Sequence, residues 1–263
     1  MKLLSTEAFK KIQLEILIDI HEFCVKNNIK YFLAYGTLIG AIRHEGFIPW
    51  DDDIDICMPR PDYMRFAELY NHSKYSFYCP EKTKNFPYIH GKVSDDSTIV
   101  IENTNKKFPI GVNIDVFPID GLSSDYLEAK KHYESIVKTR NIINIKKISF
   151  STKRKISRNL LLLILKLLTI IIPFNKAIKD LNGKMRKYDY NNSKYVGELC
   201  FGDSKRVLEK TLFETIVLHK FEGYDFYIPI GYDKWLKTIF KDYMQLPPEE
   251  KRITHHDFTV YRK

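Results

Sequence analysis

The chain has 263 residues, of which 44% are apolar and 29% charged. This is the composition of an ordinary folded protein, long enough for one large domain or a domain with an appendage. The four cysteines are far apart and form no CxxC pair, which argues against a zinc ribbon or a dense disulfide framework and favours a reducing compartment. The N-terminus soon turns charged and amphipathic, so we expect no secretory signal and a cytoplasmic protein.

The net charge of +9 is unevenly distributed along the chain. Between Ser135 and Lys179 there are eleven Lys or Arg residues and no acidic residue, so the rest of the chain has a net charge of −2. The excess of positive charge therefore belongs to one segment and needs a local explanation.

Apolar periodicity and turn residues predict a mixture of helices and strands. The predicted helices are Glu7–Asn27, capped by Ser5–Thr6, then Thr37–His44, Pro61–Asn71, Ser123–Ile145 and one near Tyr232–Tyr243. The predicted strands are Tyr31–Tyr35, Asp53–Met58, Tyr88–Val93, Thr98–Ile101, Val112–Phe117 and a hairpin of Ile216–Phe221 with Tyr224–Ile228. This mixture indicates an α/β or α+β fold.

The most informative segment is the acidic cluster at residues 51–55. Four carboxylates in five positions repel one another, so a folded protein keeps them only with compensating cations. In a strand, Asp53 and Asp55 would lie on one face about 7 Å apart. Asp115, between Ile114 and Val116 in another predicted strand, would lie about 5 Å from this pair if the strands are neighbours. Three carboxylates so placed predict a site for divalent metal, a pair of Mg²⁺ (or Mn²⁺) ions.

Two other interpretations of the cluster are weaker. Asp51, Asp53 and Asp55 have the alternate spacing of a calcium-binding loop, but Ile56 stands where that loop needs Gly and Asp62 where it needs Glu. A solvated acidic turn would have no reason to alternate carboxylates with apolar residues, as this segment does.

A second candidate feature lies upstream, at Gly36-Thr37. A Gly and a hydroxyl residue between a predicted strand and a predicted helix favour phosphate binding, because the helix N-terminus offers free N–H groups. Gly-Thr is also a common structural turn, so this motif gains weight only together with the carboxylates.

These residues resemble a known family. Gly36-Thr37, Asp53-x-Asp55 and Asp115 between apolar residues are similar to the nucleotidyltransferase-fold superfamily, although the gap from Thr37 to Asp53 is longer than usual. The string YGTLIGAIRHEGFIPWDDDIDICMPRPDY resembles the LicD/fukutin family, and the resemblance runs from about Tyr31 to His256. It implies a nucleotidyltransferase-like mixed sheet flanked by helices, with an inserted basic and apolar helical segment.

The resemblance also implies an activity: transfer of a phosphoalcohol, typically phosphocholine from CDP-choline, onto a sugar hydroxyl of a cell-surface glycan such as a teichoic acid, capsule or lipopolysaccharide precursor. Related members use CDP-ribitol. The metal on Asp53 and Asp55 would meet the donor's diphosphate, which Gly36–Thr37 would cradle, and Asp115 is the candidate base. Alternatives are a nucleotidyltransferase that releases pyrophosphate from an NTP, and a non-catalytic membrane-associated binding module.

Three further residues are candidates for the same site. Arg43 and Lys92 could neutralise developing charge, and Trp50 could stack a base or a choline-type cation. For Arg43 and Lys92, an ordinary surface position is an equally good interpretation.

The sequence predicts a division of the chain into three parts. Residues 1–134 form the catalytic core, residues 135–190 a basic helical segment, and residues 191–263 a part that packs on the core and completes the substrate site.

The apolar run within the basic segment is too short to span a membrane. Leu160–Ile172 would reach only ~20 Å as a helix, short of the ~30 Å hydrocarbon core of a bilayer. Next to Lys146, Lys147, Lys153, Arg154, Lys155 and Arg158 it resembles an in-plane anchor on an anionic membrane, where the glycan acceptor would be lipid-linked. A buried core helix with a solvated basic loop is the alternative. No module for nucleic acid is apparent.

Overall fold

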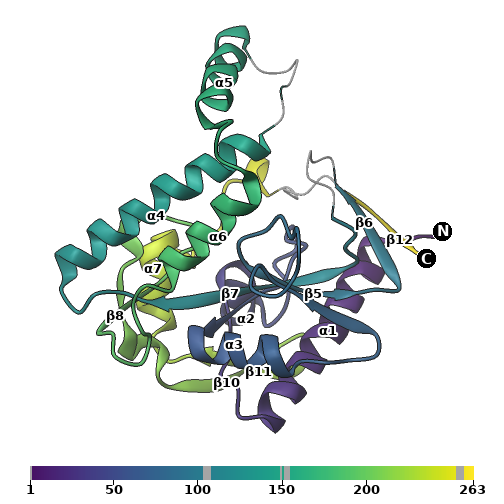
Figure 1. Cartoon of the computed structure of the whole chain (residues 1–263). Coiled ribbons are helices and arrows are strands. Elements are labelled where there is room, and N and C mark those ends of the chain that lie inside the picture. Colours follow the sequence, from purple (N-terminus) through teal and green to yellow (C-terminus); the bar gives the residue numbers. More distant parts are fainter. Residues whose placement is uncertain (1, 103–107, 149, 151–154, 253–257) are drawn as a thin grey trace.

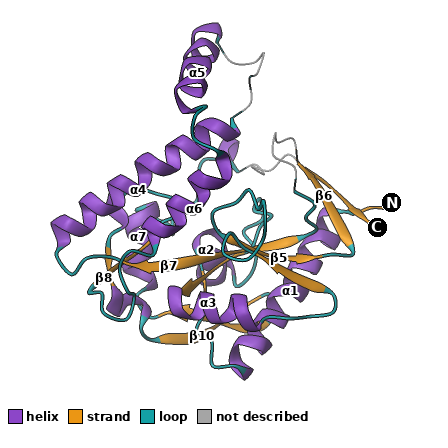
Figure 2. Ribbon diagram, viewed as in Figure 1, coloured by secondary structure: helices purple, strands orange, loops and turns teal. Residues whose placement is uncertain are grey.

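The computed structural model describes residues 2–102, 108–148, 150, 155–252 and 258–263 (Figure 1). The predicted α/β class is confirmed, because a mixed sheet is flanked by helices (Figure 2). Along its main path the sheet runs β2 (Phe32–Leu33), β3 (Asp55–Pro59), β7 (Asn113–Gly121), β5 (Gly91–Asp95) and β4 (Tyr75–Tyr78).

Strand β7 is the centre of this sheet. It runs parallel to β3 on one side. On its other side its first half pairs with β5 and its second half with β8 (Tyr195–Glu198), which in turn pairs with β9 (Leu208–Glu209). In β3, Ile56 and Met58 are fully buried, and Ile56 follows the less buried Asp55 on the opposite face, as the period of a strand requires. Asp55 and Ile56 thus point to opposite faces of β3, as predicted for this strand.

Three helices pack on these strands. Helix α1 (Thr6–Lys26) begins at the predicted cap, since the Ser5 hydroxyl accepts a hydrogen bond from the backbone N–H of Ala8 at 3.2 Å. It packs on β5 and β7, while α3 (Arg60–Leu69) packs on β3 and β7 and α2 (Tyr35–His44) on β3. Helices α2 and α3 agree with their predicted ranges to within two residues.

The C-terminal part packs on the same core. The predicted hairpin is confirmed as β10 (Ile216–Phe221) and β11 (Tyr224–Pro229), with positive φ at Glu222 and Gly223 in the turn. Helix α7 (Tyr232–Phe240) buries Trp235, whose ring lies 5.7 Å from the rings of Phe32 and Tyr35. This packing holds the elements that lead into the acidic cluster.

The two ends of the chain meet in a second, small sheet. Strand β12 (Phe258–Arg262) pairs with both β1 (Lys2–Leu3) and β6 (Thr98–Glu102) (Figure 1). Of these, only β6 was predicted, because β1 and β12 owe their pairing to contacts across the whole length of the chain.

Helix α4 (Tyr126–Lys147) confirms the predicted helix at Ser123–Ile145 and runs beside α6 (Phe174–Met185), while α5 (Ile156–Thr169) projects from the body (Figure 1). The apolar run does not stay helical to Ile172, because α5 ends at Thr169 and Pro173 precedes α6. The boundary at residues 134 and 135 falls inside α4, and the division into three parts stays a prediction.

Among the described helices, none is by itself long and apolar enough to cross a membrane. Only α5 and α6 taken together, with a bend of 79° between them, reach that length and composition.

Candidate active site

Three charged residues lie in one row across three strands. Parallel pairing of β3 with β7 sets Asp55 opposite Asp115, and antiparallel pairing of β5 with β7 sets Lys92 opposite Asp115 from the other side. Side chains at paired positions of neighbouring strands point to the same face. The structure therefore brings together Asp55, Asp115 and Lys92, three residues selected from the sequence.

Asp115 is held by two partners. Its Oδ1 accepts a hydrogen bond from the Lys92 ammonium, and its Oδ2 lies 3.1 Å from Nε2 of His90. Lys92 also donates to the side-chain oxygen of Asn113 at 3.0 Å. Burial alone would raise the pKa of the Asp115 carboxyl, but Lys92 and His90 outweigh it and hold the pKa below its usual range. Asp115 is thus held as an ionised carboxylate, and its role as general base stays a prediction.

Asp55 has the opposite electrostatic setting. Burial and repulsion from Asp53 and Asp115 raise the pKa of the Asp55 carboxyl well above its usual range, and Lys92 offsets this only in part. A hard cation bound between crowded carboxylates stabilises their ionised form, because it offsets their mutual repulsion. The chemistry of this donor set thus fits the Mg²⁺ or Mn²⁺ expected from the sequence.

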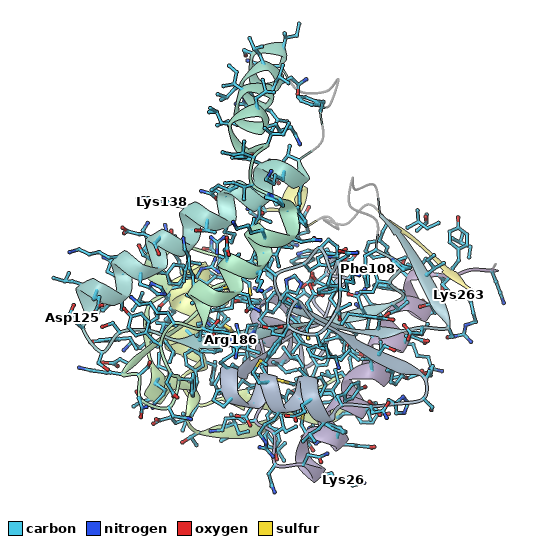
Figure 3. All side chains as sticks on the ribbon, in the orientation of Figure 1. Lys26, Phe108, Asp125, Lys138, Arg186 and Lys263 are labelled. Carbon is cyan, nitrogen blue, oxygen red and sulfur yellow. The ribbon has the colours of Figure 1, made fainter. Side chains whose placement is uncertain are left out.

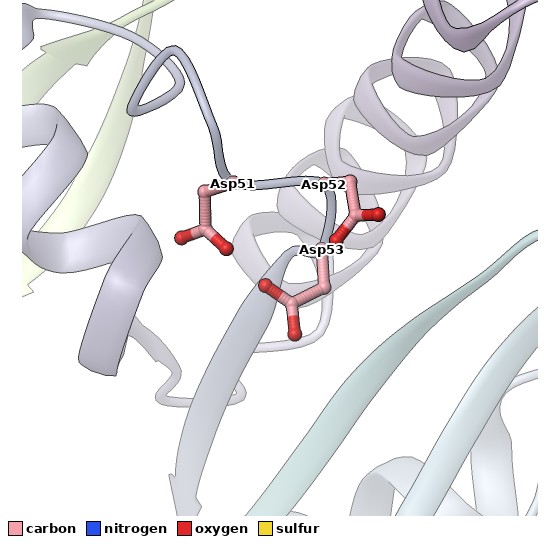
Figure 4. Close-up of side chains that lie close together, drawn as sticks. All are labelled: Asp51, Asp52 and Asp53. Atoms are coloured by element: carbon pink, nitrogen blue, oxygen red, sulfur yellow. The ribbon is translucent and has the colours of Figure 1, made fainter. Parts of the chain in front are cut away.

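The loop before β3 adds further carboxylates. Asp53 lies in this loop and not in the strand, since β3 begins at Asp55. Ligand oxygens of Asp51, Asp52 and Asp53 lie within 4.8 Å of one another. Figure 4 shows these three side chains on the loop that leads into β3. Asp51 also contributes to the raised pKa of Asp55. The structure therefore adds Asp51 and Asp52 to the carboxylates that could hold a metal.

A small cavity of about 60 Å³ opens beside this row of charges. Asp53, Lys92 and Asp115 line it, together with Phe9 and Gln13 of α1. The cavity gives a small charged group access to these carboxylates and to the Lys92 ammonium.

Gly36 and Thr37 lie beside the cluster and have protein partners. A Cβ on Gly36 would collide with Oδ2 of Asp51, so a larger residue here would push that carboxylate out of its present position. The buried Thr37 hydroxyl accepts a hydrogen bond from the backbone N–H of Asp55 at 2.8 Å, which fixes the start of β3. Both residues thus position the carboxylates, whether or not they also contact a phosphate.

Arg43 and Trp50 are held by the C-terminal part. The Arg43 guanidinium donates to the backbone carbonyl of Tyr243 at 2.5 Å, and the guanidinium of Arg252 lies 5.6 Å from the centre of the Trp50 ring. His44 meets the Trp50 ring edge to face at 6.5 Å. The contacts of Arg43 tie α2 to the segment after α7, and within the described part of the chain none of them connects Arg43 to the row of charges.

Two residues outside the predicted set complete the surroundings. His90 is buried, its pKa is lowered by burial despite the nearby Asp115, and its Nδ1 finds no hydrogen-bond partner among the described residues. Glu198 is buried at the end of β8, where it accepts hydrogen bonds from the Tyr35 hydroxyl at 2.8 Å and from the backbone N–H of Cys200. A signal that could have found His90 was its place two residues before the selected Lys92, whereas no local pattern pointed to Glu198.

Tyr35 connects this network to the strained start of α2. It has a positive φ of 47°, a conformation that non-glycine residues adopt only when their surroundings hold them there. The bond from its hydroxyl to Glu198 and the packing of its ring on Phe117, at 5.6 Å, supply that constraint. The strain therefore lies next to Gly36 and the carboxylate cluster.

Comparison with known proteins identifies the family. The family model described as LicD/FKTN/FKRP, nucleotidyltransferase domain, matches residues 28–154. The chain is 33% identical to the lipopolysaccharide cholinephosphotransferase LicD of Haemophilus influenzae over 273 aligned residues, which cover 99% of each chain. The chain belongs to the LicD family. The resemblance seen at residues 35–63 is thus confirmed.

Two shorter similarities concern uncharacterised proteins. One, from Rickettsia typhi, is 32% identical over 145 residues, covering 45% of this chain and 46% of that protein. Another, from Rickettsia prowazekii, is 40% identical over 75 residues, covering 25% of this chain and 28% of that protein. Both are partial, so the full-length similarity to LicD carries the functional argument.

Proposed function

We propose that this LicD-family protein transfers phosphocholine from CDP-choline to a sugar hydroxyl of a cell-surface glycan, with CMP as the leaving group. The observation that carries the proposal is the row Asp55–Asp115–Lys92 across β3, β7 and β5. The full-length similarity to a lipopolysaccharide cholinephosphotransferase supports the choice of transferred group.

A divalent metal, Mg²⁺ or Mn²⁺, fits the acidic side of this row. Asp55, with Asp53 and Asp51 from the preceding loop, would hold it, and Asp115 would border it from β7. When bound, the metal supplies charge neutralisation for the donor's diphosphate. Two ions are expected from the sequence, and this number stays part of the proposal.

The protein's own residues supply the rest of the chemistry. Lys92 holds a fixed positive charge beside Asp115, at the edge of the cavity where negative charge would develop on the phosphorus centre. His90 holds Asp115 from the other oxygen and so fixes its orientation. The strained turn at Tyr35 and the Thr37 bond to Asp55 hold the carboxylates in place before the substrate arrives.

The acceptor in this proposal is a lipid-linked glycan precursor at the inner face of the plasma membrane, with the enzyme bound peripherally. The basic segment supports this placement, since it is the part of the chain where cations gather without acidic residues. Lys153 and Arg154 of that segment lie outside the described residues.

The proposal is tested by donor binding and by turnover. Titration calorimetry with CDP-choline, CDP-ribitol, CDP-glycerol and CTP, each with and without Mg²⁺, should show metal-dependent binding of CDP-choline above the others. CMP release in the presence of a choline-free glycan acceptor should follow the same metal dependence and disappear with EDTA. Asp55→Asn should lose both metal-dependent binding and turnover, whereas Asp225→Asn, at an exposed carboxylate of the β10–β11 hairpin, should keep both.

Preference for CTP with release of pyrophosphate would replace the proposal by nucleotidyl transfer, the activity after which the domain family is described. Unchanged turnover of Asp55→Asn would remove the proposed metal site.

A further inference from the structure

Helix α5 exposes an apolar face that the described residues do not cover. Its side chains stand outside the body of the molecule (Figure 3). Leu168 is 69% exposed, and Ile171, just past the helix end, is 84% exposed. The exposed apolar residues of this face, called the α5 face from here on, include Leu160, Leu161, Ile164, Leu167, Leu168 and Ile171.

The α5 face is continuous. At about 100° per residue its side chains fall on roughly one third of the helix circumference, whereas the buried Leu162 and Thr169 lie on the opposite side. That opposite side is fixed to α4 by two bonds: Lys146 donates to the carbonyl of Thr169, and Lys166 donates to the carbonyl of Lys146. The helix is thus held by its inner side and turns its apolar side outward.

A continuous apolar surface of this kind marks a contact with a partner or a membrane. The surrounding charge decides between a bilayer and a second copy of the chain. The eleven Lys and Arg residues between Ser135 and Lys179 come without any acidic residue, so two copies docked through α5 would bring like charges together. An anionic lipid surface matches both the apolar face and its charge.

The same end of α4 lies beside the candidate active site. The Lys147 ammonium, at the last residue of α4, lies 5.2 Å from the centre of the Tyr88 ring, and the Lys92 ammonium lies 4.8 Å from the same centre. Tyr88 therefore connects the end of α4, where α5 is attached, to the lysine that holds Asp115. A membrane that holds α5 would therefore orient the chain through the same end of α4 that borders the site.

We infer that the α5 face docks into the interface of an anionic membrane and that this docking presents the Asp55–Asp115–Lys92 site to acceptors carried in that membrane. The first half concerns binding alone. The second half rests on the proposed function.

Docking is tested by flotation of the full chain with vesicles of phosphatidylcholine alone or of phosphatidylcholine and phosphatidylglycerol in equal parts. The wild-type protein should float with the anionic vesicles, and high salt should weaken this binding. The double variant Ile164→Asp/Leu168→Asp should bind at least about tenfold more weakly, since charges enter the bilayer interface poorly. The matched control is Leu127→Asp, a leucine that is 66% exposed in the first turn of α4, and it should bind like wild type.

Circular dichroism and thermal melting check that each variant is folded; we expect them to be, because Ile164, Leu168 and Leu127 are all exposed and their replacement leaves the core intact. Absence of wild-type flotation at physiological salt would overturn the docking. So would a stable dimer by light scattering that the double variant converts to monomer, since the α5 face would then be covered by a second copy.

A soluble acceptor distinguishes failure of docking from failure of the proposed function. With CDP-choline and a water-soluble glycan fragment, the double variant should turn over like wild type, while with acceptor embedded in anionic vesicles it should lose about tenfold in rate. If the wild-type protein transfers phosphocholine but does not float with anionic vesicles, docking alone is refuted. If the wild-type protein floats but transfers phosphocholine to neither acceptor, the proposed function alone is refuted. Equal rates of the double variant and the wild type on the vesicle-bound acceptor would refute the claim that docking presents the site to acceptors in the membrane.

Discussion

A buried ion pair at the far end of the β3–β7 ladder gives a quantitative prediction about stability. Arg60 follows β3, where Pro59 is paired with Ile119, and its guanidinium donates to both oxygens of Asp120 on β7, at 2.6 and 2.9 Å. It also donates to Glu81 at 2.8 Å. The three side chains are no more than 9% exposed, so water cannot replace a lost partner.

Arg60→Met should therefore be strongly destabilising, because it leaves two buried carboxylates without their cation. Removing one partner of a buried pair costs about 3–5 kcal/mol. For a chain of this length that cost corresponds to a fall in Tm of roughly 6–20 °C. Urea denaturation followed by circular dichroism gives the free energy of unfolding, and the midpoint should move at unchanged slope.

A double-mutant cycle then isolates the pair. Arg60→Met combined with Asp120→Leu should cost less than the sum of the single variants, with a coupling energy of about 2 kcal/mol. The exposed pair Lys220–Asp225, with side chains 54% and 49% exposed, is the control and should couple by less than about 1 kcal/mol. The claim that the buried Arg60–Asp120 pair stabilises the end of the β3–β7 ladder would be refuted by either of two results. One is a loss of unfolding free energy below about 1 kcal/mol for Arg60→Met, and the other is a coupling energy no larger than that of the control.

Three further predictions concern the site and its strands. Asp55→Asn removes a partly buried charge that neighbouring carboxylates repel, so the metal-free protein should gain about 1 kcal/mol by urea denaturation; a loss of stability would contradict the repulsion. Lys92→Met should lower CMP release by about 100-fold because Asp115 loses its cation, and Lys92→Arg should restore part of it; equal rates in all three would exclude an electrostatic role. Gly91→Ala would make a Cβ collide with the Phe77 ring of β4 and should cost about 1–3 kcal/mol, whereas Gly183→Ala in α6 meets nothing and should gain about 0.5–1 kcal/mol; similar melting of the two variants would refute this packing.

Local patterns predicted the parts of the fold that local physics determines. The alternation of Asp and Ile identified β3, the Ser5 cap identified the start of α1, and Glu222–Gly223 identified the β10–β11 turn. Each of these depends on neighbours within a few residues, so the sequence alone carries the information.

The parts that the sequence did not predict depend on distant partners. Strand β4 is four residues long and exists through its pairing with β5, and β1 exists through its pairing with residues at the other end of the chain. The role of His90 follows from the position of Asp115 on a neighbouring strand, and that of Glu198 from the Tyr35 hydroxyl. Hydrophobic periodicity reports local structure, so it does not predict contacts between residues far apart in the chain.

The geometry also changes the weight of the three predicted metal ligands. The sequence treated Asp53, Asp55 and Asp115 alike, but Asp115 is already balanced by Lys92 and His90, while the surroundings of Asp55 raise its pKa. A cation gains most where negative charge is least compensated, so it should bind nearer to Asp55 than to Asp115. Asp55→Asn should therefore abolish the stabilisation of the protein by Mg²⁺ in thermal melts, whereas Asp115→Asn should weaken it only in part. Equal loss in both variants would return Asp115 to the same standing as Asp55.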